Sequence, residues 1–124
     1  MTVLINLPAA ASYAGVLRTT AAAMAARCDL SYDRLEDARL AIDEAFAQVV
    51  SYSQVDATIE CAFSEAPNDL RFVLSGPTVL DTQLPTDSFS WTVLSALADE
   101  LQAEVSDGRL SIHVRVKESQ EVSV

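Results

Sequence analysis

Several residue types are scarce in this chain of 124 residues, and each scarcity excludes a class of protein. There are two cysteines, three glycines, four prolines and one histidine. Cys28 and Cys61 have no histidine or further cysteine at metal-ligand spacing, so we expect two buried free thiols and no metal site. We expect the single histidine, His113, on the outward side of a strand. No apolar run is long enough to span a membrane.

Basic residues are scarce as well, with eight lysines and arginines against eighteen aspartates and glutamates and a net charge of −10. Nucleic-acid binding requires cations that neutralise phosphates, so this balance argues against it. A basic protein partner would be attracted instead, mainly through faster association. The N-terminal residues Met-Thr-Val-Leu-Ile-Asn contain no basic segment, so we expect no signal peptide and a cytoplasmic location.

Half of the residues are hydrophobic, which is enough for a single domain, 1–124, with its own core. Hydrophobic periodicity predicts strands and helices in this order: strand 2–7, helix 12–28, helix 31–52, strands 58–64 and 70–74, helix 88–102, strands 103–106 and 110–117. No repeated strand–helix crossover is present. The order therefore predicts an α+β fold, a two-layer sandwich in which three helices cover one face of a mixed, mostly antiparallel sheet.

The longest helical period, 31–52, is the segment around which the chain is organised. Ser31 is the expected N-cap, and positions 35, 38, 42, 45 and 49 form one buried stripe. Glu44 and Gln48 lie one turn apart beside that stripe. A carboxylate and a carboxamide so placed can align a water or a metal, and the alternative is the solvated flank of an amphipathic helix.

The helix predicted at 12–28 has an unusual outward face. We expect Tyr13, Leu17, Thr20, Met24 and Cys28 to face inward. The outward side carries only small residues and one arginine: Ala14, Gly15, Ala22, Ala25 and Arg18. Exposed helices usually carry charged pairs, so this face suggests a docking surface centred on one guanidinium. The alternative is that alanine was selected here for helix propensity.

Three stretches together resemble one protein family. Residues 38–45, Ala-Arg-Leu-Ala-Ile-Asp-Glu-Ala, are similar to the N-box helix of GHKL-type ATPases in the form found in RsbW-type anti-sigma factors. Residues 13–20 resemble the first helix of those proteins. Residues 88–101, which begin Ser-Phe-Ser-Trp, resemble the helix after the nucleotide lid in the divergent actinobacterial, UsfX-type branch. The strand order fits as well, so the resemblance covers nearly the whole chain.

The resemblance implies a cytoplasmic regulator of transcription that captures a sigma-B/sigma-F-type sigma factor, as in stress responses. An anti-anti-sigma protein of the STAS type would release the sigma factor by partner switching. Such proteins usually dimerise through their sheets, so a homodimer is expected. A family arginine on the first helix contacts the partner and falls on Arg18, with Ala14 and Ala22 beside it.

In well-preserved members of that family, ATP and magnesium bind and a serine of the antagonist is phosphorylated. The catalytic glutamate of the N-box matches Glu44, but Gln48 stands in place of the magnesium-binding asparagine. The adenine-binding box, Asp-x-Gly-x-Gly, is reduced to Leu74–Thr78, in which only Gly76 remains. We therefore expect these site residues to be vestigial.

The glycine-rich lid is replaced as well, by residues 88–91. We expect Leu74, Phe89 and Trp91 to fill the former cleft and Asp87 to cap the following helix, where it would repel phosphate. The sequence thus predicts a binding protein without ATP or magnesium as cofactor. The alternative is an active protein-serine kinase that uses ATP and magnesium, with Glu44 as general base.

Overall fold

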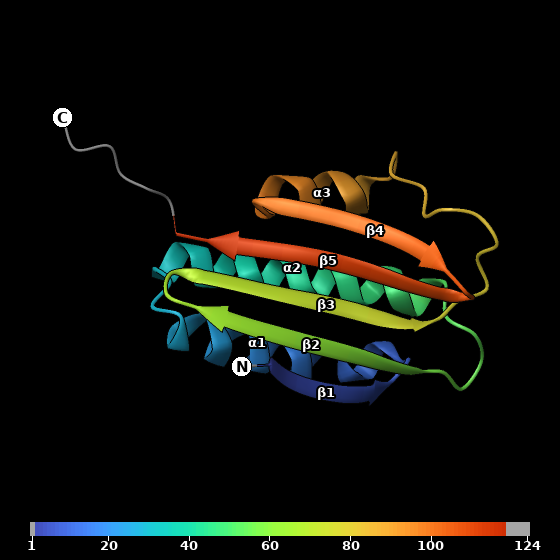
Figure 1. Ribbon diagram of the computed structural model, residues 1–124, viewed down its shortest axis with the longest axis horizontal. Coiled ribbons are helices and arrows are strands. Elements are labelled where there is room, and N and C mark those ends of the chain that lie inside the picture. Colours follow the sequence, from blue (N-terminus) through green and yellow to red (C-terminus); the bar gives the residue numbers. More distant parts are fainter. Residues whose placement is uncertain (1, 119–124) are drawn as a thin grey trace.

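The computed structural model describes residues 2–118, which form one five-stranded sheet and three α-helices. In chain order the elements are β1 (Thr2–Pro8), the 3-10 turn η1 (Ala11–Tyr13), α1 (Ala14–Arg27), α2 (Tyr32–Ser51), β2 (Thr58–Ala66), β3 (Asp69–Pro77), α3 (Phe89–Leu97), β4 (Glu100–Ser106) and β5 (Arg109–Lys117). The strands lie in the order β1-β2-β3-β5-β4 (Figure 1).

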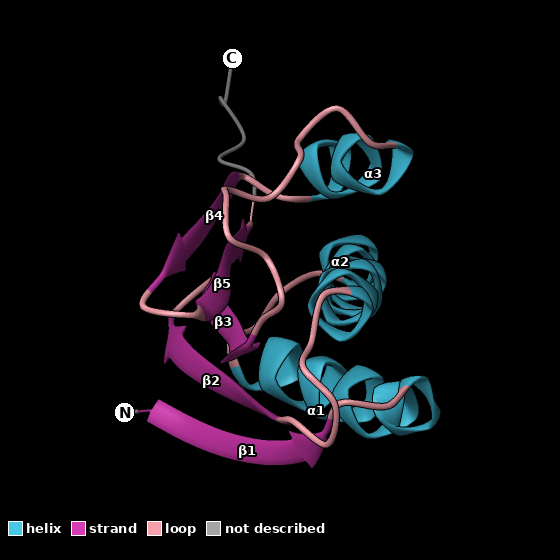
Figure 2. Cartoon of the chain, turned by 90° about the vertical axis from the view of Figure 1, so that its right-hand side faces the viewer, coloured by secondary structure: helices cyan, strands magenta, loops and turns pink. Residues whose placement is uncertain are grey.

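All three helices lie on the same face of the sheet, with α2 between α1 and α3 (Figure 2). This arrangement confirms the predicted α+β two-layer sandwich. Every pair of neighbouring strands is antiparallel, so the sheet is not mixed. Antiparallel neighbours need only short turns, and the Asp107–Gly108 turn between β4 and β5 has positive φ at both residues, as a tight hairpin requires.

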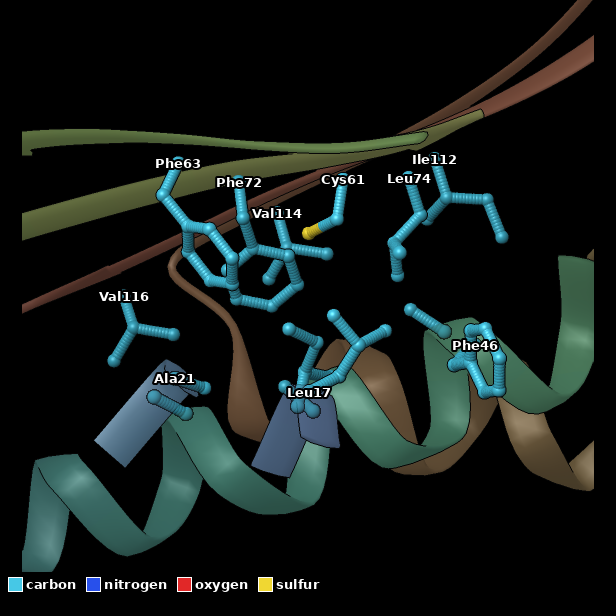
Figure 3. Close-up of a cluster of buried hydrophobic side chains, with 14 of the residues drawn as sticks. Leu17, Ala21, Phe46, Cys61, Phe63, Phe72, Leu74, Ile112, Val114 and Val116 are labelled. Atoms are coloured by element: carbon cyan, nitrogen blue, oxygen red, sulfur yellow. The ribbon is translucent and has the colours of Figure 1, made fainter. Parts of the chain in front are cut away.

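The core lies between the sheet and the helices. Alternate residues of the strands point towards the helices, and the side chains of Phe63, Phe72, Leu74 and Ile112 are fully buried there (Figure 3). From the other layer, α2 contributes Phe46, together with the buried residues Ala38, Ala41, Ile42, Ala45 and Val49. Burial of each large side chain contributes roughly 1.5–3 kcal/mol.

The central helix α2 follows the sequence prediction closely. The Ser31 hydroxyl accepts a hydrogen bond from the Arg34 backbone N–H, which caps the first turn. Four of the five predicted stripe positions are buried, and Leu35 is half-buried. The stripe is wider than predicted because Ala41 and Phe46 are also buried, so α2 contacts the sheet and a neighbouring helix at once.

The third helix is shorter than predicted, and the end of the predicted segment 88–102 is strand. Helix α3 ends at Leu97, and Leu101 belongs to β4. Residues 101, 103 and 105 of β4 all point towards the core, with the two-residue period of a strand. The sequence analysis assigned Leu101 to a helical period instead. Asp99 fixes the change of direction, because its N–H donates to the Arg115 carbonyl and its carboxylate accepts from the Lys117 N–H.

The inward side of α1 also differs from the prediction. Leu17, Met24 and Cys28 are buried as expected, but Tyr13 is exposed. Ala25, which was predicted to face outward, is completely buried. Small side chains fill inward positions of this helix because α1 packs against α2 as well as against the sheet, and alanine permits a close approach.

The two cysteines and the histidine lie where the sequence predicted. Cys28 and Cys61 are free and buried, and His113 is exposed. Burial raises the pKa of the Cys28 thiol, and it raises the pKa of Cys61 to about 12. Both are therefore poor nucleophiles. Among residues 2–118, no helix combines the length and the apolar character needed to cross a membrane.

The position of the core predicts a sharp contrast between two leucines of the same sheet. Leu74 is completely buried, whereas Leu4 is 59% exposed on the uncovered face. We expect Leu74→Ala to lower the free energy of unfolding by about 2–5 kcal/mol, through lost burial and a cavity. The matched change Leu4→Ala should cost the monomer less than about 1 kcal/mol, so both variants are compared at protein concentrations too low for association. Urea denaturation of both variants measures the difference, and equal losses would contradict this position of the core.

Candidate functional site

The candidate anchor residue, Arg18, lies on α1 at its contact with α2. Its Nη1 donates to Oδ1 of Asp43 at 3.0 Å, and the two side chains are 43% and 38% exposed. Arg18 therefore has a partner within its own chain, which the sequence analysis did not foresee. The pair remains accessible to another protein, because neither side chain is buried.

The small residues beside Arg18 lie on the same side of α1. Ala14 and Ala22 are one turn before and one turn after it, and both are half-buried. Arg18 reaches Asp43, so this side of α1 lies towards α2. Ala14 packs against the core, whereas Ala22 is half-buried at the edge of the helix contact. This packing gives the small-residue face a structural role within the chain. Binding of a partner by Ala14 and Ala22 stays a prediction.

An exposed apolar side chain lies beside the Arg18–Asp43 pair, and sequence reasoning missed it. Leu40 on α2 is 54% exposed. Leu40 is three residues before Asp43, so the two side chains are neighbours on the helix surface. A signal was present in the sequence, because Leu40 lies outside the buried stripe of α2. We call these three residues, Arg18, Leu40 and Asp43, the α1–α2 patch.

Glu44 lies on the flank of α2 that faces α3. The Ser90 hydroxyl donates a hydrogen bond to the Glu44 carboxylate at 2.7 Å. Ser90 belongs to the Ser-Phe-Ser-Trp segment, but its contact with Glu44 was not predicted. Ser88, not Asp87, caps α3, since the Ser88 hydroxyl accepts from the Trp91 N–H. The prediction that Asp87 caps this helix was wrong, because the serine next to it is better placed.

The other predicted nucleotide-site residues lie in different surroundings. Gln48 is half-buried one turn further along α2. Leu74 points into the core near Ile112 and Phe46 (Figure 3). Gly76 has a packing role, since a Cβ there would lie 3.3 Å from Ile59 Cγ1, which is tighter than nine in ten real Cβ contacts.

The expectation that Phe89 fills the former cleft was wrong. Its side chain is 75% exposed at the start of α3. Trp91 is half-buried and packs against the core, and Leu74 is fully buried. Position 89 is the first residue of α3, and its side chain points away from the core while Trp91 and Leu94 point towards it.

The opposite face of the sheet is not covered by helices and carries an open depression of about 500 Å³. Arg71, Val73, His113 and Arg115 contribute to its lining. Arg115 forms ion pairs with Asp69 and with Glu100, both at 2.7 Å. Its hydrogen bonds lower the pKa of both carboxyl groups. No group of three potential metal-ligating side chains occurs in the part of the chain between residues 2 and 118.

No protein-family model matches the chain. Two curated Mycobacterium tuberculosis proteins, both named anti-sigma-F factor RsbW, are each 34% identical to it over 107 residues; they come from the strains CDC 1551 / Oshkosh and ATCC 25618 / H37Rv. The predicted resemblance to RsbW is confirmed. The aligned part covers 85% of this chain and 62% of each RsbW protein, so the chain spans less than two thirds of their length.

The fold is also that of a solved structure that contains an RsbW domain. The crystal structure of the RsbU and RsbW domains of Rv1364c from Mycobacterium tuberculosis matches with a TM-score of 0.76. The match covers 98% of this chain and 33% of that one, at 17% sequence identity. At this identity the comparison supports the RsbW-like fold and nothing finer.

The contact between α2 and α3 predicts an energetic coupling between Ser90 and Glu44. An intramolecular hydrogen bond is expected to contribute about 0.5–1.5 kcal/mol to stability. A double-mutant cycle with Ser90→Ala and Glu44→Ala, measured by urea denaturation, should therefore show a coupling of that size. Ser95→Ala is the matched control, because Ser95 bonds only within α3, to the Trp91 carbonyl. Additive effects for Ser90 and Glu44 would show that the bond contributes nothing in solution.

Proposed function

We propose that this protein is an anti-sigma factor that binds a sigma-B/sigma-F-type sigma factor and withholds it from RNA polymerase. An anti-anti-sigma protein of the STAS type would release the sigma factor. The observation that carries the proposal is the 34% identity, over 85% of the chain, to two proteins named anti-sigma-F factor RsbW. In this function the domain acts by covering a surface of its partner, and no chemical step is required.

The α1–α2 patch supports this proposal physically. It combines an exposed leucine with an accessible guanidinium, and such a mixture is typical of interface centres. The net charge of −10 would speed association with a basic partner. Arg18 would be the charged anchor, with Ala14 and Ala22 leaving room for close approach along α1.

The uncovered sheet face supports the proposed homodimer. Leu4, Ala62 and Val73 lie opposite one another across β1, β2 and β3, on the side away from the helices. They form an apolar row on a face that no other element of residues 2–118 covers (Figure 2). A second copy packed against this face would bury the row. We also propose a cytoplasmic location, because the proposed partners are a sigma factor and its antagonist.

The nucleotide site is proposed to be vestigial, without ATP or magnesium. Glu44 is the only catalytic residue that the resemblance provides, and its carboxylate already accepts a hydrogen bond from Ser90. Leu74 takes the adenine-binding position and points into the core. The kinase alternative requires Ser90 to leave Glu44 and the adenine to bind without its aspartate.

The proposed partner surface predicts that Arg18→Ala weakens binding of a purified sigma-F-type sigma factor by about tenfold or more, because an interface loses its charged anchor. Isothermal titration measures the affinity, and circular dichroism checks the fold. Arg27→Ala is the matched control, since Arg27 at the end of α1 forms an ion pair with Glu65 on β2, away from the patch, and its loss should leave the affinity within about twofold. Equal affinities of all three proteins would contradict the assignment of Arg18.

The proposed loss of the nucleotide site predicts no phosphotransfer. With labelled ATP, magnesium and an anti-anti-sigma substrate, wild type and Glu44→Ala should give the same background signal. Titration with ATP and magnesium should show no binding in the micromolar range, because the adenine contact, the phosphate-binding lid and the metal ligand are all changed. Labelled substrate that depends on Glu44 would establish the kinase in place of the binding module.

A further inference from the structure

We propose that Asp43 is a built-in competitor for Arg18: it occupies the guanidinium in the free protein, and a carboxylate of the bound protein displaces it. This inference rests on the proposed function, in which Arg18 anchors the partner. It adds a residue that sets the affinity of the α1–α2 patch and the chemistry of the group that the patch accepts.

The Arg18–Asp43 pair has the geometry of a weak, readily broken contact. One N–H of Arg18, on Nη1, reaches one oxygen of Asp43 at 3.0 Å. The guanidinium lies along α1, since a Cβ placed on Gly15 would be 3.5 Å from Nη2 of Arg18. Both side chains are about two-fifths exposed, so water and other solutes reach the pair. Asp43 thus holds Arg18 through a single end-on bond.

Arg18 has more hydrogen-bond donors than Asp43 accepts from. A guanidinium presents five N–H donors in a planar fork, and a carboxylate that meets two of them makes a stronger, bidentate contact. Asp43 is fixed on α2 and meets one. A carboxylate on a partner is free to approach along the fork. The group that best completes this patch is therefore an aspartate or glutamate side chain, with an apolar neighbour that covers Leu40.

Asp43 has two opposing effects on the affinity for a partner carboxylate. The larger effect decides whether removing the charge of Asp43 strengthens or weakens binding. Asp43 orders the Arg18 side chain, which favours binding, but an exposed single-bond pair orders a long side chain only weakly. Against this, Asp43 must give up its bond, and its charge repels the incoming carboxylate at close range. The other acids around it are already engaged, since Glu44 accepts from Ser90 and Glu36 pairs with Arg39. Removing the charge of Asp43 should therefore strengthen binding.

The decisive variant is Asp43→Asn in the full chain, titrated with a purified sigma-F-type sigma factor. We expect its affinity to rise by about three- to tenfold over wild type. In the Arg18→Ala background the same change should have no effect, because there is no guanidinium left to release. Asp33→Asn is the matched control. It removes the same charge from the first turn of α2 and should not raise the affinity.

A second measurement needs no partner. Phenylglyoxal modifies accessible arginines, and mass spectrometry of the digested protein reports the rate at Arg18. Asp43→Asn should raise that rate about two- to fivefold, as expected for the release of a weak surface pair, while the rate at the exposed Arg27, which pairs with Glu65, stays unchanged. An unchanged rate at Arg18 would overturn the claim that Asp43 occupies it in solution.

The outcomes separate this inference from the proposed function. If wild type does not bind the sigma factor, the proposed function fails, and so does the claim that a partner carboxylate displaces Asp43. The modification rate still decides whether Asp43 occupies Arg18 in the free protein. If wild type binds and Asp43→Asn binds more weakly, Asp43 contacts the partner itself and the competitor role is overturned. A gain that persists in the Arg18→Ala background would overturn it as well.

Discussion

Burial of the apolar stripe of α2 against the inward face of the antiparallel sheet is the interaction on which the rest of the structure depends. Phe46 on the helix and Phe72 and Leu74 on β3 are completely buried between the two layers. A five-stranded sheet with one apolar face is stable only when that face is covered, and α2 covers its middle (Figure 2). The flanking helices α1 and α3 then pack against α2 and the rest of the sheet.

This central position gives two consecutive residues of α2 different neighbours. Successive residues on a helix point about 100° apart. Asp43 consequently meets Arg18 of α1 on one flank, and Glu44 meets Ser90 of α3 on the other. The proposed partner surface and the proposed vestigial nucleotide site are thus built on opposite flanks of one helix. The exposed outer face of α2, with Leu40 and Ala47, lies between the two flanks.

Sequence patterns predicted the fold well wherever a single period was present. The stripe of α2 and the hairpin β2–β3 have clear periods of 3.6 and 2, and both were found. The end of α3 was missed because Leu94, Leu97 and Leu101 satisfy a helical period, while Leu101 also begins the alternation of β4. Pairing with β5 decides between them, and a pairing between distant segments is invisible in a local window.

The sequence indicated candidate site residues, but it did not indicate which side chains they contact. Arg18 and Glu44 stand out by composition and by family resemblance, yet neither pattern indicates that Asp43 and Ser90 are their partners. Which side of α1 faces α2 depends on how closely the two helices approach, and small residues fit both an open surface and a close contact. Ala25 illustrates the point, since the same alanine that suggested an outward docking face is fully buried.

The hydrogen bond between Ser90 and Glu44 also bears on how such a protein could be regulated. A nucleotide-dependent switch requires a cover that moves when the ligand binds. Here α3 packs with Leu94 in the core and with Ser90 bonded to Glu44. If no nucleotide binds on that flank, as proposed, release of a bound protein has to act through the surface that holds it. A competitor for the α1–α2 patch would then have to match its chemistry, an acidic anchor beside an apolar side chain, and the proposed role of Asp43 would let the patch exchange one carboxylate for another.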